Sequence, residues 1–367
     1  MSLSKILLLC ILLSLSFVKA QAQYRFDHWT TDNGLPQNSV RRIVQTSDGY
    51  LWLTTLDGLV RFDGVRFTVF NKSNSKNLPG NRFVDLFAEA DDTLWINIEE
   101  QGLVRYRNGK FSTFTMADGL PSNIVGQVFL KPDGNLYVPT LNGLARFDGT
   151  GFTVVSTRKE LAQSRSLSAA SGSFWEINKD SLSVLKNGQK SVFDLPAALK
   201  NKFSSDLDLN YWVRLFEDRQ GVLWISTHRS NESRFSSNKL FKFADGKFAE
   251  IVAEEMPRSP INDIAQDRRG TLWFGTILDG ACRLEQNKFN CFNSENKLTT
   301  NQTRTIFTDR EGTLWLTSED KGIYRVGEQI IVSLSTKEGL AEKNAYVVYE
   351  DRSGAIWIGC ARRADQI

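Results

Sequence analysis

Histidine is almost absent from this sequence, and its absence narrows the chemistry that the chain can carry. Only His28 and His228 occur among 367 residues, so a histidine metal cluster or a Ser-His-Asp triad has little material. A G-x-S-x-G nucleophile elbow and a P-loop are also missing from the sequence. We therefore expect no catalytic residues, no metal site and no cofactor, and we predict that the protein is not an enzyme.

Positive and negative charges are also nearly balanced in this sequence. Lys and Arg number 45 and Asp and Glu number 42, which gives a net charge of +3, and the two signs are interspersed. A nucleic-acid surface needs basic residues gathered on one face. The composition therefore predicts no nucleic-acid partner.

Long hydrophobic runs are missing after the first 22 residues. Lys5 precedes an apolar run of 13 residues, Ile6 to Val18, and Ala20-Gln21-Ala22 forms an A-x-A cleavage site. The run is too short to span a bilayer comfortably, although an uncleaved anchor is the alternative. We predict a signal peptide at residues 1–22, cleaved before Gln23, and hence an exported, periplasmic protein.

Cysteine is scarce, and the sequence holds no C-x-x-C pair that would indicate a zinc or redox motif. Beyond the N-terminal apolar run the cysteines are Cys282, Cys291 and Cys360. The first two flank a hairpin turn expected at Gln286-Asn287, which places them opposite each other on two strands. An exported compartment permits a disulfide between them, with two packed free thiols as the alternative, and in both cases the role is structural.

What the sequence does contain is a repeat. The segment Asp309 to Arg325, DREGTLWLTSEDKGIYR, recurs with variations along the chain. One aromatic residue per repeat sets the period, at Trp52, Trp95, Tyr137, Trp175, Trp224, Trp273, Trp315 and Trp357. The steps are 38 to 49 residues, the size of a propeller blade of four short strands. Strand-like alternation at residues 50–55, with Gly and Asp at each turn, excludes a solenoid of helical repeats.

We therefore predict an all-β fold, a β-propeller of four-stranded blades within residues 23–344. Tyr24 to Trp29 is similar to the outermost strand of a repeat, so it can complete the blade of Trp315 and close a ring of seven. Residues 345–367 are then a partial extra repeat with a divergent tail. A ring of eight is the alternative, but it leaves one blade without its third strand.

The repeated pattern resembles a known family. Each unit reads D-x-x-G-x-L-W-I-G-T, then G-L-x-R-F/Y, then a G-L-P-x-N linker, which is clearest at Asp118 to Asn123 and at residues 32–38. This is similar to the two-component regulator propeller repeat, which forms the exported sensor region of bacterial hybrid sensor kinases and of some diguanylate cyclases. In that family a small β domain, a membrane helix and a signalling domain usually follow the repeats, and this sequence contains none of them. We therefore expect the chain to lack its own output domain.

The resemblance implies a function. It predicts a periplasmic ligand-sensing or recognition propeller of a two-component or cyclic-di-GMP signalling system. Its ligand would be an oligosaccharide or another small extracellular molecule, and its partner a membrane-bound signalling protein or a second propeller. Two alternatives remain open. A propeller lyase, of the streptogramin-lyase or polysaccharide type, needs converging His, Glu or metal ligands, and a protein-interaction scaffold needs an apolar or charged patch on one face.

Three residue types recur once per repeat, and each has a structural and a functional interpretation. We expect the repeated Trp to pack between blades rather than to stack on a ligand. We expect the Asp before it to accept backbone bonds in its own turn rather than to bind calcium; these are Asp48, Asp133, Asp218, Asp267, Asp309 and Asp351. The linker Asn is expected to close a turn, with a ring of amides at the axial opening as the alternative; these are Asn38, Asn81, Asn123, Asn301 and Asn344.

Candidate ligand-binding residues lie where the repeats differ. The linkers between blades and the loops from the second to the third strand open on one side of a propeller, and unlike loops on a rigid scaffold are where binding usually occurs. The polar residues that these loops carry are Asp57, Glu99, His228, Arg229, Arg234, Asp279 and Asp320. We predict that ligand binding involves this set.

Overall fold

A computed structural model describes residues 24–157, 164–200, 211–229, 238–328, 344–350, 356–360 and 364–366 of the chain. The predicted signal peptide, residues 1–22, lies outside these ranges and stays a prediction, and Arg234 also lies outside them. Within these ranges the chain has no helix that is long and apolar enough to cross a membrane.

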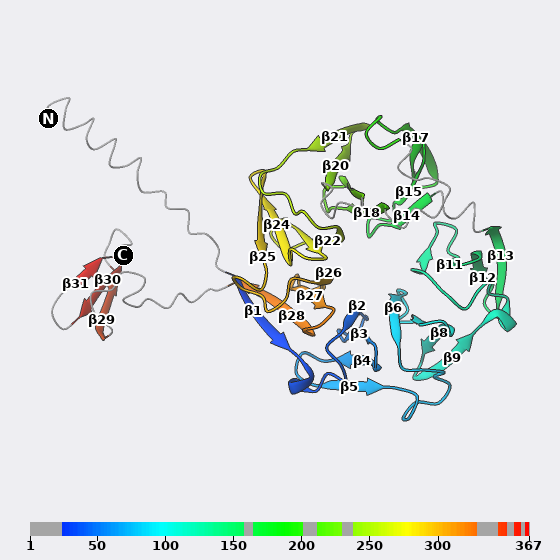
Figure 1. Ribbon diagram of the computed structural model, residues 1–367, viewed down its shortest axis with the longest axis horizontal. Helices are drawn as coiled ribbons and strands as arrows, with labels where there is room; N and C mark the ends of the chain where they lie inside the picture. The colour runs from blue at the N-terminus through cyan, green and yellow to red at the C-terminus, as the bar shows by residue number, and fades with distance from the viewer. Residues whose placement is uncertain are drawn as a thin grey trace. The chain divides into compact units, whose positions relative to one another are not determined.

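Seven antiparallel sheets of four strands surround a common axis (Figure 1). This confirms the predicted all-β propeller and the ring of seven blades. In the first six blades the strands follow one another outward in chain order, so the first strand of each blade lies nearest the axis. Two short 3-10 helices, η1 (Thr31–Asn33) and η2 (Met116–Asp118), are the helical elements of the described residues.

The first four blades follow the repeats of the sequence. Blade 1 consists of β2 (Val40–Gln45), β3 (Leu51–Thr55), β4 (Gly58–Phe62) and β5 (Phe67–Phe70). Blade 2 consists of β6 (Phe83–Ala88), β7 (Leu94–Ile98), β8 (Gly102–Arg107) and β9 (Lys110–Phe114). Blade 3 consists of β10 (Phe129–Leu130), β11 (Leu136–Thr140), β12 (Gly143–Phe147) and β13 (Phe152–Thr157). Blade 4 consists of β14 (Ser164–Ser168), β15 (Phe174–Asn178), β16 (Ser181–Lys186) and β17 (Gln189–Asp194).

The remaining three blades complete the ring. Blade 5 consists of β18 (Tyr211–Glu217), β19 (Leu223–Arg229), β20 (Lys239–Ala244) and β21 (Lys247–Ile251). Blade 6 consists of β22 (Ile261–Gln266), β23 (Leu272–Thr276), β24 (Ala281–Glu285) and β25 (Lys288–Phe292). Blade 7 consists of β26 (Thr303–Thr308), β27 (Leu314–Ser318), β28 (Ile323–Glu328) and β1 (Tyr24–Trp29).

The strand from the N-terminal side closes the ring, as the sequence predicts. β1 pairs with β28 as the outermost strand of blade 7. Asp27 accepts a hydrogen bond of 3.0 Å from Arg325, and the ring of His28 stacks on Tyr324 at a centroid distance of 4.2 Å. The indole of Trp29 lies 5.6 Å from that of Trp315. The seam is therefore held by the pairing of β1 with β28, by the contact of Asp27 with Arg325 and by aromatic packing, without a covalent link among the described residues.

The C-terminal repeat forms a sheet of its own. β29 (Ala345–Glu350), β30 (Ile356–Cys360) and β31 (Ala364–Gln366) pair in that order. The eight-bladed alternative is therefore wrong, because β1 completes blade 7. The tail departs from the repeat in sequence, yet it supplies a third strand in which Gln366 lies opposite Trp357.

Within the seven blades the repeated aromatic residues pack between neighbouring blades, which confirms their predicted role there, whereas Trp357 lies in the separate C-terminal sheet and is exposed. Trp52 of blade 1 shares a hydrophobic cluster with Leu94 and Val104 of blade 2. Trp95 of blade 2 packs in the same way against Val138 and Ala145 of blade 3. The Trp residues thus form the apolar layers that hold the blades together.

The aspartates before the Trp strands occupy two different positions, which the sequence pattern does not separate. Asp218 accepts the indole N–H of Trp224 at 2.8 Å and the backbone N–H of Val222 at 2.9 Å. Asp48 sits two positions further along its turn. The hydroxyl oxygen of Thr46 therefore accepts the indole N–H of Trp52 at 3.0 Å. Both kinds serve the turn, as predicted. No group of three or more His, Cys, Asp or Glu that could hold a metal occurs in the described part of the chain.

Candidate functional site

The linkers between blades are closed by their own asparagines. The side-chain oxygen of Asn38 accepts the N–H of Thr31 at 2.8 Å, and that of Asn123 accepts the N–H of Met116 at 2.9 Å. Asn301 does the same for Ser294 at 2.9 Å. The turn-closing interpretation is therefore confirmed. We call the side of the ring that carries these linkers and the loops between second and third strands the loop face.

Two predicted acidic residues fasten loops to linkers on the loop face. The carboxylate of Asp279 accepts the N–H of Ser259 at 2.8 Å and its hydroxyl at 2.6 Å. Asp320 accepts the hydroxyl of Thr300 at 2.8 Å and that of Ser318 at 2.8 Å. In blades 6 and 7 the second-to-third-strand loop is thus tied to the linker that enters the same blade.

The remaining acidic candidates also have partners within the chain. Glu99 forms a short hydrogen bond with Arg82, and this bond lowers the pKa of the Glu99 carboxyl. Asp57 is exposed and accepts the side-chain amide of Asn81 at 3.2 Å. Both lie on the loop face as predicted, while their part in ligand binding stays a prediction.

His228 lies in a strand rather than on a loop, which corrects its predicted location. β18 and β19 stay paired as far as Tyr211 and Arg229, so His228 belongs to β19 and is 5% exposed. Its Nδ1 lies 3.1 Å from the side-chain oxygen of Asn238. Burial lowers the pKa of His228, and the hydrogen bond with Asn238 opposes this shift. The side chain of Arg229 lies outside the part of the chain that the structure describes.

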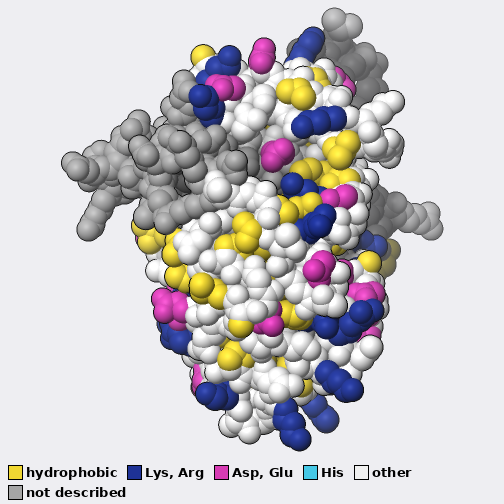
Figure 2. Space-filling view, turned by 90° about the vertical axis from the view of Figure 1, so that its right-hand side faces the viewer, with side chains coloured by type: hydrophobic (Ala, Val, Ile, Leu, Met, Phe, Trp, Pro, Cys, Tyr) yellow, Lys and Arg dark blue, Asp and Glu magenta, His cyan; other side chains and the backbone are white. Residues whose placement is uncertain are grey.

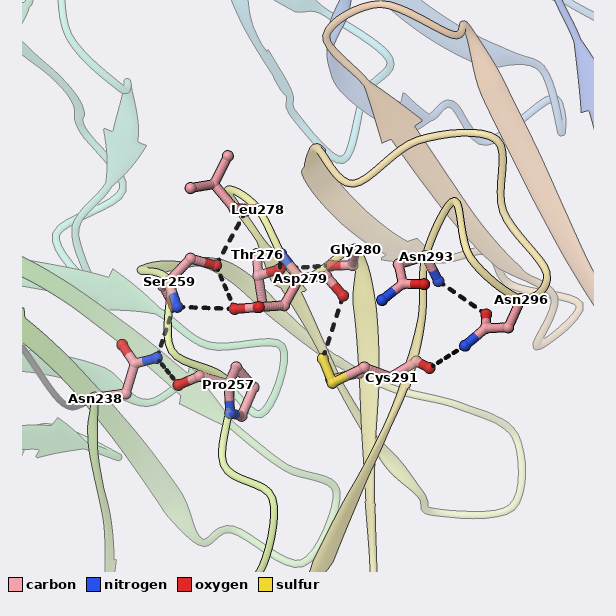
Figure 3. The surroundings of a disulfide bond; sticks show 11 residues. Asn238, Pro257, Ser259, Thr276, Leu278, Asp279, Gly280, Cys291, Asn293 and Asn296 are labelled. Carbon is pink, nitrogen blue, oxygen red and sulfur yellow. Dashed lines mark hydrogen bonds between the residues drawn. A yellow bond between two sulfur atoms is a disulfide. The ribbon is translucent and has the colours of Figure 1, made fainter. Parts of the chain in front are cut away.

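A hydrogen-bond chain fixes the tautomer of His228. The amide nitrogen of Asn238 donates to the carbonyls of Pro257 at 2.6 Å and Ser259 at 2.7 Å (Figure 3). Its oxygen is left to accept, so Nδ1 of His228 carries the proton. Ser259 then bonds Asp279, so two of the predicted residues belong to one network between blades 5 and 6.

The disulfide lies beside this network (Figure 3). Cys282 of β24 and Cys291 of β25 face each other in register and are joined by an S–S bond of 2.02 Å. Asn296 donates to the carbonyl of Cys291 at 3.0 Å. The sequence left a disulfide and two free thiols as alternatives, and the structure contains the disulfide. It links the two outer strands of blade 6, β24 and β25.

Polar residues around the axis, five of them charged, form a feature that the sequence reasoning missed. Seven residues each stand ten positions before the repeated aromatic residue of their blade. They lie on the innermost strands or directly before them, and we call them the axial ring: Arg42, Asp85, Gln127, Arg165, Arg214, Asp263 and Thr305. The constant spacing is the signal that could have found them.

Contacts between distant blades show that the axial ring converges. Nε of Arg42 lies 3.5 Å from a carboxylate oxygen of Asp85, and Nη1 lies 3.7 Å from one of Asp263. Arg42 belongs to blade 1 and Asp263 to blade 6, which are separated by blade 7. Their side chains therefore meet over the axis rather than within a blade interface.

A register shift helps to aim these side chains. In β2, β6 and β22 the pairing with the second strand skips one residue directly before Arg42, Asp85 and Asp263. Such a β-bulge bends the strand and redirects the side chains beside it. The bulges therefore contribute to the convergence of these three residues at the axis.

The axial ring lines a space that water can enter. The side chains of Arg42, Asp85 and Asp263 keep 28%, 22% and 23% of their surface exposed, although protein surrounds them. Burial raises the pKa of Asp263 and outweighs the opposite effects of Arg42 and Arg214. Burial lowers the pKa of Arg42, but the carboxylates of Asp85 and Asp263 reverse this, so its pKa lies above the ordinary value.

A separate cavity of about 320 Å³ lies between blades 2 and 3. Its lining includes Asp91 and Asp148, which sit on turns from first to second and from third to fourth strands, on the side opposite the loop face. Asp91 pairs with Arg107 at 3.0 Å. None of the predicted ligand-binding residues is among those that line this cavity. Figure 2 shows charges of both signs intermixed on one side of the molecule.

Comparison with known proteins identifies the repeats. Residues 34–57, 206–229 and 255–277 match the family model described as two component regulator propeller. The resemblance found in the sequence is thereby confirmed for these three segments, and the chain folds as a seven-bladed propeller. No curated protein matches the sequence significantly.

Solved structures share the fold. The extracellular domain of the hybrid two component system BT3049 from B. thetaiotaomicron is 24% identical, with a TM-score of 0.65 over 92% of this chain and 47% of that one. The extracellular domain of BT4673 from the same organism is 20% identical, with a TM-score of 0.61 over 94% and 46%. The chain thus spans about half the length of these relatives.

Enzymes are among the similar structures too. Virginiamycin B lyase from Staphylococcus aureus is 13% identical, with a TM-score of 0.57 over 83% of this chain and 99% of that one. At identities of 24% and below, these similarities establish the fold and leave the activity open.

Proposed function

We propose that this chain is the exported ligand-recognition propeller of a signalling system, and that its ligand binds on the loop face over the axial ring. One observation carries the proposal: a closed ring of seven blades holds unlike polar loops around a charged axis whose side chains are partly exposed. Support comes from the repeats of the two component regulator propeller type and from the similar extracellular domains of hybrid two component systems.

The mechanism follows from how the loops are held. Asp279 and Asp320 fasten loops to the linkers of their own blades, so a hydroxyl-rich ligand such as an oligosaccharide can compete for these carboxylates. Such competition would loosen the loop from the linker and change the surface that the loop face presents. A membrane-bound signalling partner, or a second propeller docked there, would respond to that change.

A non-enzymatic role is part of the proposal. A virginiamycin B lyase that lost one histidine is catalytically inactive, so that propeller enzyme depends on a histidine. In this chain His228 is buried and bonded to Asn238, and His28 stacks on Tyr324 in the ring-closing strand. Neither imidazole is placed as a general base on an open surface, which favours recognition over lyase chemistry.

A ligand screen tests the proposal. Protein comprising residues 23–367 is mixed with neutral and acidic oligosaccharides, and thermal unfolding is followed. A ligand at 100 times its Kd should add about 2.7 kcal/mol to the free energy of unfolding. Asp320→Asn should weaken a binding ligand, whereas Asp148→Asn on the opposite face should not. Unchanged unfolding with every sugar, or an effect of Asp148→Asn alone, would contradict binding on the loop face.

A further inference from the structure

The axial ring carries more positive than negative charge. Arg42, Arg165 and Arg214 supply three guanidinium groups, whereas Asp85 and Asp263 supply two carboxylates, which leaves an excess of one positive charge. Both carboxylates lie within 4 Å of a single guanidinium, that of Arg42, at 3.5 and 3.7 Å. The negative charge is therefore concentrated on one side of the cluster.

Arg214 differs from Arg42 in the hydrogen-bond partner of its guanidinium group. Its Nε donates a short hydrogen bond to the backbone carbonyl of Asn262, which is a neutral acceptor. Burial is the main cause that lowers the pKa of Arg214; the carboxylates of Asp263 and Asp85 oppose this shift, and the guanidiniums of Arg42 and Arg165 add to it. Guanidinium groups crowded in this way favour the arrival of an anion, because Coulomb attraction strengthens where water is partly excluded.

The mouth of the axis on the loop face has the same sign of charge. Arg41 and Arg304 stand one position before Arg42 and Thr305 on the inner strands. They share one carboxylate, that of Glu319 on the loop between β27 and β28, at 3.3 and 2.8 Å. In addition, Nε of Arg41 is buried without a hydrogen-bond partner. An anion that approaches from the loop face thus meets two guanidiniums that share a single carboxylate.

We propose that the axial ring is a binding site for a small oxyanion, with a carboxylate as the type ligand, seated against Arg214 and reached from the loop face. Guanidinium forks match the geometry of carboxylate oxygens and donate two parallel hydrogen bonds to them. The side chains of Arg42 and Asp263 keep part of their surface exposed, so water reaches both groups. The carboxylate is either that of a free small acid or the acidic group of a sugar. The proposal does not depend on the sensing role.

The test uses three probes at constant ionic strength: sodium acetate, glucuronate and glucose. Saturable binding to the full chain is measured by calorimetry at neutral pH. Acetate and glucuronate binding alike would indicate a site for a free acid, and tight glucuronate with weak acetate would indicate an acidic sugar. Both outcomes support the site. Glucose binding as tightly as glucuronate, or neither anion binding, would overturn it.

Two ring variants with opposite expected effects locate the site. Arg214→Gln should weaken anion binding by about tenfold or more, because a charge-assisted hydrogen bond is lost. Asp85→Asn should tighten binding, since it removes a competing carboxylate and leaves every guanidinium in place. Arg107→Gln, which lies in the ion pair with Asp91 on the opposite side, is the matched control and should leave binding unchanged.

The pair of variants keeps the test decisive even if one of them is unstable. Thermal unfolding without anion shows whether each variant is folded, and an unfolded Arg214→Gln leaves Asp85→Asn to decide. Equal affinity in the folded wild type and Asp85→Asn would place any bound anion elsewhere. An effect of Arg107→Gln as large as that of Arg214→Gln would have the same meaning.

Discussion

At the scale of single residues, the aspartate that begins each complete Trp turn has two partners at once. In blade 7, Asp309 accepts the backbone N–H of Thr313 at 2.7 Å with one oxygen and the indole N–H of Trp315 at 2.8 Å with the other. One carboxylate thus sets both the turn and the orientation of the residue that packs against the next blade.

Replacing an aspartate that binds the indole should destabilise the fold more than replacing one that serves only the turn. We expect Asp309→Ala to lower the free energy of unfolding by about 1–3 kcal/mol, because a buried indole N–H loses its acceptor. Asp48→Ala is the control, since its carboxylate serves the turn while Thr46 bonds the indole of Trp52. Urea denaturation measures both. Equal losses would show that the indole bond contributes little.

His228 should make stability depend on pH. Burial lowers its pKa in the folded state, so the unfolded state binds the proton first as the pH falls. Its contribution is complete above about pH 6.5, the ordinary pKa of histidine, and is lost as the pH falls through the lower pKa of the folded state. Denaturation at several pH values should show this decline. It should be absent in His228→Gln and present in His28→Gln, and an unchanged decline in His228→Gln would refute the assignment.

At the scale of elements, the ring closure depends on a close approach of backbones. Gly322 adopts a positive φ of +75°, and a Cβ on it would lie 2.0 Å from the carbonyl oxygen of Trp29 in β1. Because β1 is the outermost strand of blade 7, any side chain at position 322 pushes the closing strand away.

Gly322→Ala should therefore weaken the closure specifically. Gly64→Ala is a matched control, because its φ is +95° and a Cβ there meets nothing within 4 Å. Both variants carry a backbone strain of about 1–2 kcal/mol. We expect Gly322→Ala to lose about 2 kcal/mol more, with faster hydrogen exchange in β1. Equal losses, or unchanged exchange in β1, would show that the seam tolerates the added methyl group.

Sequence reasoning succeeds for features that every blade repeats. The Trp layer, the Asp turns and the linker asparagines each recur in several repeats of the sequence. Their roles therefore follow from local chemistry and from the period of the repeat. The closing strand was predictable because residues 24–29 resemble the outer strand of a blade. His228 was misplaced because β19 extends further than the other second strands, and only its pairing with β18 shows this.

At the scale of the whole molecule, the axial ring exists only because seven blades close. Arg42 and Asp263 are more than two hundred positions apart, and their side chains come within 3.7 Å after closure. Each blade contributes one polar residue that is unremarkable in its own repeat. The site could not be predicted without the ring, although its spacing is visible in the sequence.

The axial ring should bind anions more tightly in mild acid. Burial raises the pKa of Asp263, and the guanidiniums of Arg42 from β2 and Arg214 from β18 oppose this shift. As the pH falls through that raised pKa, one carboxylate is neutralised and the net charge of the ring becomes more positive. Glucuronate affinity measured from pH 7 downward should rise several-fold.

Two variants show whether Asp263 is responsible. Asp263→Asn should bind more tightly at pH 7 and lose most of the pH dependence. Asp91→Asn, in the ion pair with Arg107 on the other side, should retain it. A pH dependence that survives in Asp263→Asn would assign the effect to another group.

The closing strand also has a mechanical consequence. Because β1 and β28 are neighbours in one sheet, the propeller begins and ends at adjacent positions, as the contact of Asp27 with Arg325 shows. A pulling force between the two ends therefore loads only this outer strand pair and leaves six blades unstressed. It would unzip the pair from its open end rather than shear it, so tension applied at the chain ends would open the propeller at one seam first.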